Sequence, residues 1–264
     1  MKLTKEKLQD FLEKKYEEYN SIKFIESDPI SIPHQFTKKE DIEIAGFLTA
    51  TIAWGQRITI IKNATKMMRL MNNNPLEFVL NATKNDLQRF DQFVHRTFNG
   101  VDAIHFIKSL QNIYTKHNGL SAVFLPDASV VDPDKEYTAL SAITNFRNIF
   151  FSIKTPERTF KHVSNPAENS SAKRICMYLR WMIRNDKRGV DFGLWKNDQF
   201  NSQQLMCPLD VHSGNVARKL GLLTRNQNDW KAVEELTANL KIFDPKDPVK
   251  YDFALFGLGV FEKF

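Results

Sequence analysis

The sequence predicts an all-α protein, and three features of the chain lead to this prediction. Apolar residues recur at the three- and four-residue spacing of a helix face, alternation with a period of two is absent over useful lengths, and most glycines and prolines stand between helical segments. A chain of 264 residues that is 42% hydrophobic can also bury a sizeable core. We expect a single unit, residues 1–264, with two helical lobes and a cleft between them: residues 56–175 form one lobe, and residues 1–55 with 176–264 form the terminal lobe.

The first part of the chain predicts a helix, a tight turn and a second helix. Residues 41–54 form the first helix, Gly55 breaks it, and Gln56 lies in the turn. The second helix runs to the sequence NNNP at residues 72–75. The buried face of the first helix contains Ile44, Phe47, Leu48, Thr51 and Ile52, and that of the second contains Ile61, Ala64, Met68 and Met71.

Two further helices are predicted in the middle of the chain. One covers residues 101–117, with Asn118 and Gly119 as its stop signal, and the other covers residues 137–153. Between them, the segment 126–137 contains two prolines and four acids and is predicted to be a loop.

The last third of the chain predicts at least two more helices. Apolar spacing from Ile175 onwards indicates a helix with Lys173 in its first turn. Asp247 and Pro248 form an N-cap and first-position pair, and Gly257 is predicted to end the final helix.

Composition favours a nucleic acid partner and argues against several kinds of site. The net charge of +6 and the pI near 9.1 favour a polyanionic partner. Cys176 and Cys207 are the only cysteines, so this chain alone cannot form a disulfide framework or a four-cysteine zinc or iron–sulfur site. No two histidines pair at metal-ligand spacing with each other or with the cysteines. We therefore expect no metal, no iron–sulfur cluster and no other cofactor.

The sequence also gives an expectation for the location of the protein. Its N-terminus is charged and lacks an apolar signal core, and no apolar run is long enough to span a bilayer. We expect a cytoplasmic monomer with no membrane partner.

The segment 206–223, MCPLDVHSGNVARKLGLL, places Asp210 at the start of an amphipathic helix. A carboxylate at this position accepts backbone N–H bonds and lies at the positive helix end, and both effects favour its ionised form. Such an anion can stabilise a developing sugar oxocarbenium ion, or it can be a purely structural cap.

Lys173 precedes another helix, in the sequence NPAENSSAKRICMYLRWMIR. Arg174 and the positive helix end both disfavour an ammonium ion there, and Schiff-base chemistry requires a neutral amine. A solvated lysine in a basic turn is the structural alternative.

The order of these segments resembles the helix-hairpin-helix DNA glycosylase superfamily, to which endonuclease III belongs. In that family, a hairpin with a lysine at the start of its second helix precedes a Pro-x-Asp-x-His-type segment and an arginine-bearing helix that ends in Leu-Gly-Leu. Here Pro208, Asp210, His212, Arg218 and residues 220–222 stand in the same order.

The spacing within this pattern differs from that of endonuclease III. Asp210 follows Lys173 by 37 positions (210 minus 173), which is longer than in endonuclease III, and a longer spacing is also found in archaeal-type 8-oxoguanine DNA glycosylases. The chain also resembles an uncharacterised bacterial family of unknown function, DUF2400.

The glycosylase resemblance implies a base-excision repair enzyme with abasic-site lyase activity. Its substrate would be double-stranded DNA that contains a damaged base, such as an oxidised purine, or an abasic site. Lys173 falls on the family's nucleophilic lysine and Asp210 on its catalytic aspartate. Gln56 falls on the glutamine that relatives push into the duplex in place of the flipped nucleotide.

Further DNA contacts are expected around the hairpin. Ser170 and Ser171 stand where relatives have a glycine-rich hairpin that grips a phosphate, and their hydroxyls can substitute for it. Arg174, Arg180 and Arg218 are expected to contact phosphates, with a solvated helix face as the alternative.

Aromatic residues near these segments have two interpretations each. Phe192 and Trp195, in the inserted segment 189–200, either stack on an extruded base or anchor the segment to the core. Trp54 is either a wedge at the DNA junction or a core residue, and we favour the core.

Two other functions remain compatible with the sequence. One is a non-catalytic protein of the same fold that binds DNA lesions or unusual DNA structures. The other is a helical protein-interaction domain with no nucleic acid partner.

Overall fold

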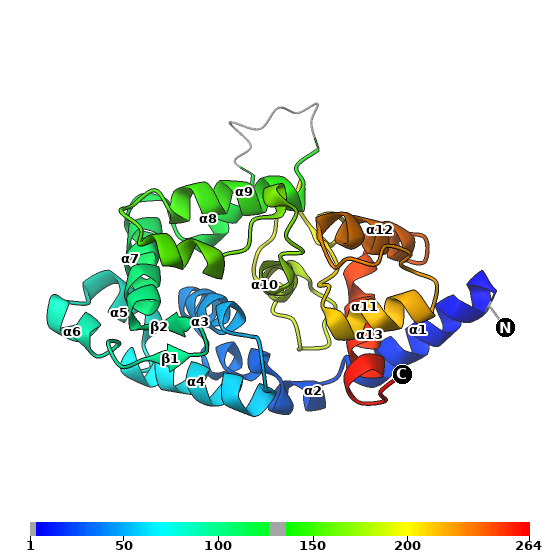
Figure 1. Cartoon of the computed structure of the whole chain (residues 1–264), viewed down its shortest axis with the longest axis horizontal. Helices are drawn as coiled ribbons and strands as arrows, with labels where there is room; N and C mark the ends of the chain where they lie inside the picture. The colour runs from blue at the N-terminus through cyan, green and yellow to red at the C-terminus, as the bar shows by residue number, and fades with distance from the viewer. Residues whose placement is uncertain (1–3, 127–135) are drawn as a thin grey trace. The chain divides into compact units, whose positions relative to one another are not determined.

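The computed structural model describes residues 4–126 and 136–264, and within these ranges the chain is mostly helical (Figure 1). This confirms the all-α prediction. The only named strands in the described ranges, β1 (Val94–His95) and β2 (Phe98–Asn99), form a short antiparallel hairpin. No helix in the described ranges is both long and apolar enough to cross a membrane.

The chain folds into two compact units, one of residues 1–24 and 165–264 and the other of residues 25–164. The lobes and the cleft expected from the sequence stay predictions. Helices of the first unit are α1 (Lys5–Tyr19), η4 (Pro166–Glu168), α10 (Lys173–Ile183), η5 (Ser202–Gln204), α11 (Val211–Lys219), α12 (Trp230–Lys241), η6 (Pro248–Lys250) and α13 (Tyr251–Val260). Helix α2 (Ile22–Ser27) spans the boundary between the units. Helices of the second unit are η1 (Pro29–Ser31), η2 (Pro33–Gln35), α3 (Lys39–Thr51), α4 (Arg57–Leu70), α5 (Pro75–Asn81), α6 (Lys84–Gln88), α7 (Gly100–Lys116), α8 (Leu120–Phe124), α9 (Ala139–Phe150) and η3 (Glu157–His162).

Helices α3 and α4 confirm the predicted helix, tight turn and second helix. Gly55 adopts a φ of 109°, which a residue with a side chain rarely adopts, and Gln56 is the N-cap of α4. At the other end of α4, Asn72 and Asn73 have φ values of 56° and 50°, so the asparagines turn the chain. Pro75 is then the first residue of α5.

The two helices predicted in the middle of the chain are also confirmed. Helix α7 ends at Lys116, and the predicted stop signal follows, because Asn118 and Gly119 have φ values of 58° and 90°. Helix α9 lies within the range predicted for it. Of the predicted loop at 126–137, residues 127–135 lie outside the described ranges.

The prediction that Gly257 ends the final helix is wrong. Helix α13 continues to Val260, and Gly257 lies inside it, against Tyr19 of α1. A Cβ on Gly257 would lie 2.1 Å from Cδ2 of Tyr19. This glycine therefore allows α1 and α13 to pack closely, and it does not stop the helix.

A cluster of phenylalanines lies in the core of the unit of residues 25–164. The ring of Phe47 on α3 lies 5.7 Å from that of Phe106 on α7, and 5.3 and 5.6 Å from those of Phe146 and Phe150 on α9. All four side chains are buried. Edge-to-face and offset contacts of this kind stabilise helix packing beyond the burial of apolar area.

Two buried arginines organise the unit of residues 1–24 and 165–264. Arg180 lies in the last turn of α10 and Arg184 is the C-cap of that helix, and they are 3% and 0% exposed. A buried charge is strongly destabilising unless it is paired, and each guanidinium here meets more than one carboxylate. The partners are Asp191 and Asp252 for Arg180, and Asp186, Asp191 and Asp247 for Arg184. These pairs connect α10 to the segment that follows it, to the start of η6 and to α13.

We expect the substitution Arg184→Met to lower the free energy of unfolding by about 3–5 kcal/mol, because it leaves buried carboxylates without their counter-ion. Arg188→Met is the matched control, since the pair of Arg188 with Glu17 is 33% and 57% exposed. It should cost at most about 1 kcal/mol. Urea denaturation measures both values, and equal effects would contradict the assignment.

Gly257→Ala should destabilise the protein by about 1–3 kcal/mol, because the new methyl group overlaps the Tyr19 ring. This sign is opposite to the gain of roughly 1 kcal/mol that helix propensity alone gives for the same change. In a Tyr19→Ala background the cost should shrink or reverse. Thermal and urea denaturation of the four proteins in this double-mutant cycle provides the test.

Candidate functional site

The structure brings Lys173 and Asp210 together. Nζ of Lys173 lies 3.5 Å from Oδ2 of Asp210, and the two side chains are 25% and 28% exposed. Lys173 is the first residue of α10, and Asp210 is the N-cap of α11. An amine and a carboxylate therefore face each other at the starts of two helices, and both side chains are partly exposed to solvent.

A sharp turn without glycine leads into Lys173. Asn169 and Ala172 both have left-handed backbone conformations, with φ values of 66° and 47°. Asparagine tolerates this conformation better than most residues, whereas alanine does so at a cost in backbone strain. Contacts with the start of α12 hold the turn, because Asn169 accepts a hydrogen bond from the amide of Trp230 at 3.2 Å and donates one to Asp229 at 3.1 Å.

Ser170 and Ser171, the expected phosphate contacts, lie in this turn and are both half-buried. Oγ of Ser170 accepts a hydrogen bond from the amide of Ala172 at 3.3 Å. Their proposed contact with DNA stays a prediction.

The two carboxylate oxygens of Asp210 have different partners. Oδ1 accepts hydrogen bonds from the amides of His212 and Ser213 at 2.9 and 3.0 Å, while Oδ2 faces Lys173. The amide of Asp210 in turn donates to Oγ of Ser213 at 3.0 Å, which completes a capping box. Burial by itself raises the pKa of Asp210, but the Lys173 ammonium and the amide of Ser213 outweigh it, so the pKa lies below its usual value. The carboxylate is therefore ionised at neutral pH.

Asp252 is a buried carboxyl group of the same unit whose pKa is influenced by the charges of Lys173 and Asp210, and the sequence-based predictions missed it. It lies on α13, it is 7% exposed, and it is ion-paired with Arg180. Burial raises the pKa of Asp252 to about 6, against the opposing charges of Arg180 and Lys173. An acid in the otherwise apolar sequence YDFALFGLGV is the signal that could have identified it.

The structure uses two of the expected phosphate contacts internally. Arg180 is buried and paired with Asp191 and Asp252. Arg218 holds the loop after α11, because its guanidinium donates to the carbonyls of Arg225 and Asn226 and to the side chain of Asn228, at 2.6–3.0 Å. Arg174 is half-buried at the second position of α10, and burial lowers the pKa of its guanidinium to about 10.

Gln56 belongs to the other unit, where it is exposed at the turn before α4. Its partnership with Lys173 therefore stays a prediction. Trp54, two residues earlier, packs against histidines: its ring centroid lies 5.0 Å from that of His95 and 6.2 Å from that of His162. Nε2 of His95 also lies 3.1 Å from the carbonyl oxygen of Trp54. These contacts give Trp54 a structural role in supporting the turn.

The aromatic residues of the segment 189–200 differ in exposure. Trp195 is 2% exposed, and its ring packs edge-to-face on Tyr178 of α10, with centroids 5.5 Å apart. Trp195 therefore anchors the segment to the core. This is the second of the two interpretations given above, the first being stacking on an extruded base. Phe192 is half-buried, and its amide donates to the carbonyl of Trp181 at 2.8 Å.

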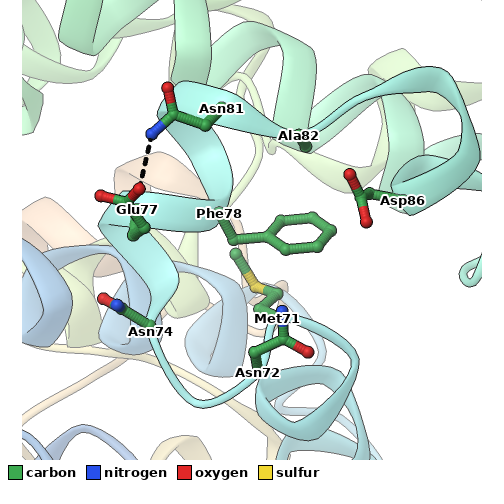
Figure 2. A pocket seen from close by; sticks show the side chains of 8 residues that line it. All are labelled: Met71, Asn72, Asn74, Glu77, Phe78, Asn81, Ala82 and Asp86. Carbon is green, nitrogen blue, oxygen red and sulfur yellow. Dashed lines mark hydrogen bonds between the residues drawn. The ribbon is translucent and has the colours of Figure 1, made fainter.

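A small pocket in the unit of residues 25–164 is separate from all of these residues (Figure 2). Its volume is about 250 Å³, and several of its polar groups are already partnered. Asn81 donates to Glu77 at 2.8 Å, and Arg89 donates to Asn72 at 3.0 Å and to Asp86 at 2.5 Å. The lining residues are Met71, Asn72, Asn74, Glu77, Phe78, Asn81, Ala82 and Asp86.

Within the described part of the chain, no three histidine, cysteine, aspartate or glutamate side chains are arranged to hold a metal ion. Cys176 and Cys207 are free and buried. Burial raises the pKa of the Cys176 thiol to about 12 and that of Cys207 well above its usual value. Both are therefore protonated packing residues and not nucleophiles.

Comparison with known proteins gives a family and no activity. Neither the curated proteins nor the solved structures include a significant match to this chain. A family model does match residues 28–261, which include Gln56, Lys173, Asp210 and Asp252. The chain belongs to the family described as "Protein of unknown function (DUF2400)".

Proposed function

We propose that this protein is a DNA glycosylase with abasic-site lyase activity that acts in base-excision repair. The observation that carries the proposal is the pairing of Lys173 with Asp210, which are 37 positions apart (210 minus 173) and whose charged groups lie 3.5 Å apart. The resemblance of the segments around these residues to helix-hairpin-helix DNA glycosylases supports the same function. The substrate is double-stranded DNA with a damaged base, for which an oxidised purine is our first candidate.

In this mechanism Lys173 is the nucleophile. Its neutral amine attacks C1′ of a deoxyribose whose base has been flipped out of the duplex, and the bond between C1′ and the base breaks. The base leaves with a proton, and the lysine becomes part of a Schiff base with the opened sugar. Loss of a proton from C2′ then expels the 3′ phosphate by β-elimination, and hydrolysis releases the amine.

Asp210 supports this reaction with its charge. Positive charge develops on the sugar as the base departs, and a fixed anion nearby stabilises it. The helix cap holds one oxygen of Asp210, so that the carboxylate is preorganised before the substrate arrives. Its lowered pKa keeps it ionised.

The DNA contacts that we retain lie at the two turns that precede α4 and α10. Gln56 is exposed at the turn before α4. Ser170 and Ser171 lie in the turn before α10, and Arg174 is the second residue of that helix. We leave out Arg180 and Arg218, since their guanidinium groups are engaged inside the protein. A net charge of +6 favours binding to the phosphate backbone.

A second candidate is a non-catalytic protein that binds DNA lesions or unusual DNA structures. The same contact favours it, because a lysine already neutralised by a carboxylate at 3.5 Å can be a structural ion pair. The third possibility is a protein-interaction domain without a nucleic acid partner. DNA binding that is absent, or that does not change with salt concentration, would favour it.

Borohydride should trap the wild-type protein covalently on duplexes that contain 8-oxoguanine or an abasic site. Lys173→Ala should abolish the adduct because it removes the attacking amine. Asp210→Asn should slow trapping by roughly 100-fold or more, since it keeps a capping side chain but removes the charge. Lys231→Ala, an exposed lysine on α12, is the control and should trap like wild type.

Binding without any adduct would contradict the lysine Schiff-base mechanism for those substrates and favour the lesion-binding protein. An adduct that persists in Lys173→Ala would contradict only the choice of nucleophile. A screen of other modified bases, with product analysis, then separates a simple glycosylase from a lyase.

Affinity for a duplex with an abasic site should fall as the salt concentration rises. Arg174→Ala should weaken binding and reduce the slope of log K against log [salt] by about 1, because one phosphate contact is lost. Arg188→Ala is the control, since that arginine is paired with Glu17 and is not among the proposed contacts. Fluorescence anisotropy at several salt concentrations provides the measurement, and an unchanged slope in Arg174→Ala would exclude this phosphate contact.

A further inference from the structure

We propose that Asn228 and Asp229 are positioning residues that set the distance between Lys173 and Asp210. They are neighbours in the loop between α11 and α12, and each holds one side of the candidate site. Asn228 holds Asp210 at the start of α11, and Asp229 holds the turn that leads into Lys173. This inference rests on the proposed function, because it assigns the two residues to the geometry in which that reaction takes place.

The side chain of Asn228 contacts the Asp210 side of the site. Its Nδ2 donates to the backbone carbonyl of Asp210 at 3.1 Å, and its Oδ1 accepts from the guanidinium of Arg218 at 2.6 Å. The side-chain amide suits both partners, because an arginine only donates and a carbonyl oxygen only accepts. A carboxylate at this position could accept from Arg218 but would have no proton to donate to Asp210.

Gly214, in the first turn of α11, leaves the space for this contact. A Cβ on Gly214 would lie 2.9 Å from Nη1 of Arg218 and 2.9 Å from Oδ1 of Asn228. The guanidinium of Arg218 is also fixed by its bonds to the loop carbonyls of Arg225 and Asn226. The loop that carries Asn228 is therefore held against the start of α11.

Asp229 contacts the other side of the site. Its Oδ2 accepts from Nδ2 of Asn169 at 3.1 Å, and the amide of Trp230 donates to the carbonyl of Asn169 at 3.2 Å. Ser170 and Asp229 also form an isolated antiparallel bridge. The carboxylate of Asp229 is itself fixed, since it caps α12 and is paired with Arg225. The turn before α10 is thus tied to the start of α12.

Two features of the site require support of this kind. The side chains of Lys173 and Asp210 are 25% and 28% exposed, and an ion pair this accessible to water does little to hold its own geometry. Ala172 has a φ of 47°, a left-handed conformation that persists only where the surroundings impose it. The contacts of Asp229 with this turn provide part of that constraint. Because Asn228 and Asp229 are adjacent, one short segment fixes both sides of the site.

The reaction proposed for Lys173 depends on this geometry. The amine has to reach C1′ while the carboxylate of Asp210 stays near the developing charge, and a displacement of about 1 Å can cost on the order of 100-fold in rate. Asn228 contacts the backbone of Asp210, and Asp229 contacts the turn before Lys173. Both residues therefore act by positioning the groups that react.

The electrostatic coupling between Lys173 and Asp210 reports on their geometry without any DNA. Burial raises the pKa of Asp210 and the ammonium of Lys173 lowers it, so Lys173→Met should raise this pKa. The rise is the coupling, and it is measured from the ¹³C-carboxyl signal of Asp210, which is assigned by its loss in Asp210→Asn. In an Asn228→Ala background the coupling should fall to roughly half or less, because the two charges move apart. An unchanged coupling overturns the role of Asn228.

A second asparagine in the same unit provides a matched control. Nδ2 of Asn239 donates to the carbonyl of Leu222 at 2.8 Å, so Asn239→Ala also removes a bond between an asparagine and a loop carbonyl. It should leave the coupling between Lys173 and Asp210 unchanged. This control separates a loss of positioning from a general loss of stability.

Asn228→Asp replaces Asn228→Ala if the latter does not fold. It keeps an acceptor for Arg218 and removes the donor to Asp210. The charge that it adds is present both with and without Lys173→Met, so it cancels in the coupling. The coupling should be reduced as in Asn228→Ala, and a coupling equal to that of the wild type overturns the proposal for Asn228.

Asn169→Gly tests the role of Asp229. Glycine adopts the left-handed conformation readily, so this substitution removes the side-chain bond to Asp229 and keeps the turn. The coupling should fall, but by less than in Asn228→Ala, because the backbone bond to Trp230 remains. Asn118→Gly makes the same change at a left-handed asparagine of the other unit and should have no effect. Equal coupling in Asn169→Gly and the wild type overturns the role of Asp229.

Borohydride trapping separates this inference from the proposed function. At saturating abasic-site DNA, Asn228→Ala should trap roughly 10-fold more slowly than the wild type, whereas Asn239→Ala should trap at the wild-type rate. The dissociation constant for DNA should stay unchanged in Asn228→Ala, because the proposed DNA contacts are retained. Loss of coupling in Asn228→Ala, together with no adduct from the wild type, contradicts the lyase alone. Wild-type trapping and unchanged coupling in Asn228→Ala contradict the positioning role alone.

Discussion

The buried pairing of Arg180 and Arg184 with aspartates is the interaction on which the candidate site depends. Two guanidinium groups at the C-terminal end of α10 are almost inaccessible to solvent, and buried charges are tolerated only when opposite charges contact them. Those charges come from Asp186 and Asp191 after α10, from Asp247 before η6 and from Asp252 on α13. The need to satisfy both arginines restricts how α10 can sit among its neighbours, and Lys173 is its first residue.

The site itself follows from the start of two helices. Free amide groups at a helix start attract an anion, and Asp210 satisfies those of α11 with one of its oxygens. The other oxygen faces an amine that stands at the start of α10, where the same helix-end effect disfavours positive charge. An ion pair of this kind can stabilise the fold or take part in a reaction. Covalent trapping on damaged DNA distinguishes the two roles.

Local sequence patterns predicted much of the fold. Apolar spacing located α3, α4, α7, α9 and α10, and stop signals such as Asn118 and Gly119 act as expected because they depend on the conformation of one or two residues. Gly257 shows where this reasoning fails. Its role depends on the ring of Tyr19, more than two hundred positions away in the chain, and no local pattern contains that contact. The internal partners of Arg180 and Arg218 could not be predicted for the same reason, because the sequence around a basic residue on a predicted helix does not show which carboxylates or carbonyls it will contact.

The sequence by itself determined the helical class, the start of α10 at Lys173 and the capping role of Asp210, because these properties arise from neighbouring residues. Only the tertiary structure decided which side chains are enclosed and which charges meet. It brought Lys173 and Asp210 to 3.5 Å, buried Trp195 and Arg180, and paired Arg180 with Asp252. The physical reason is that burial and electrostatic coupling depend on distance in space, and the helices that supply these residues are far apart in the chain.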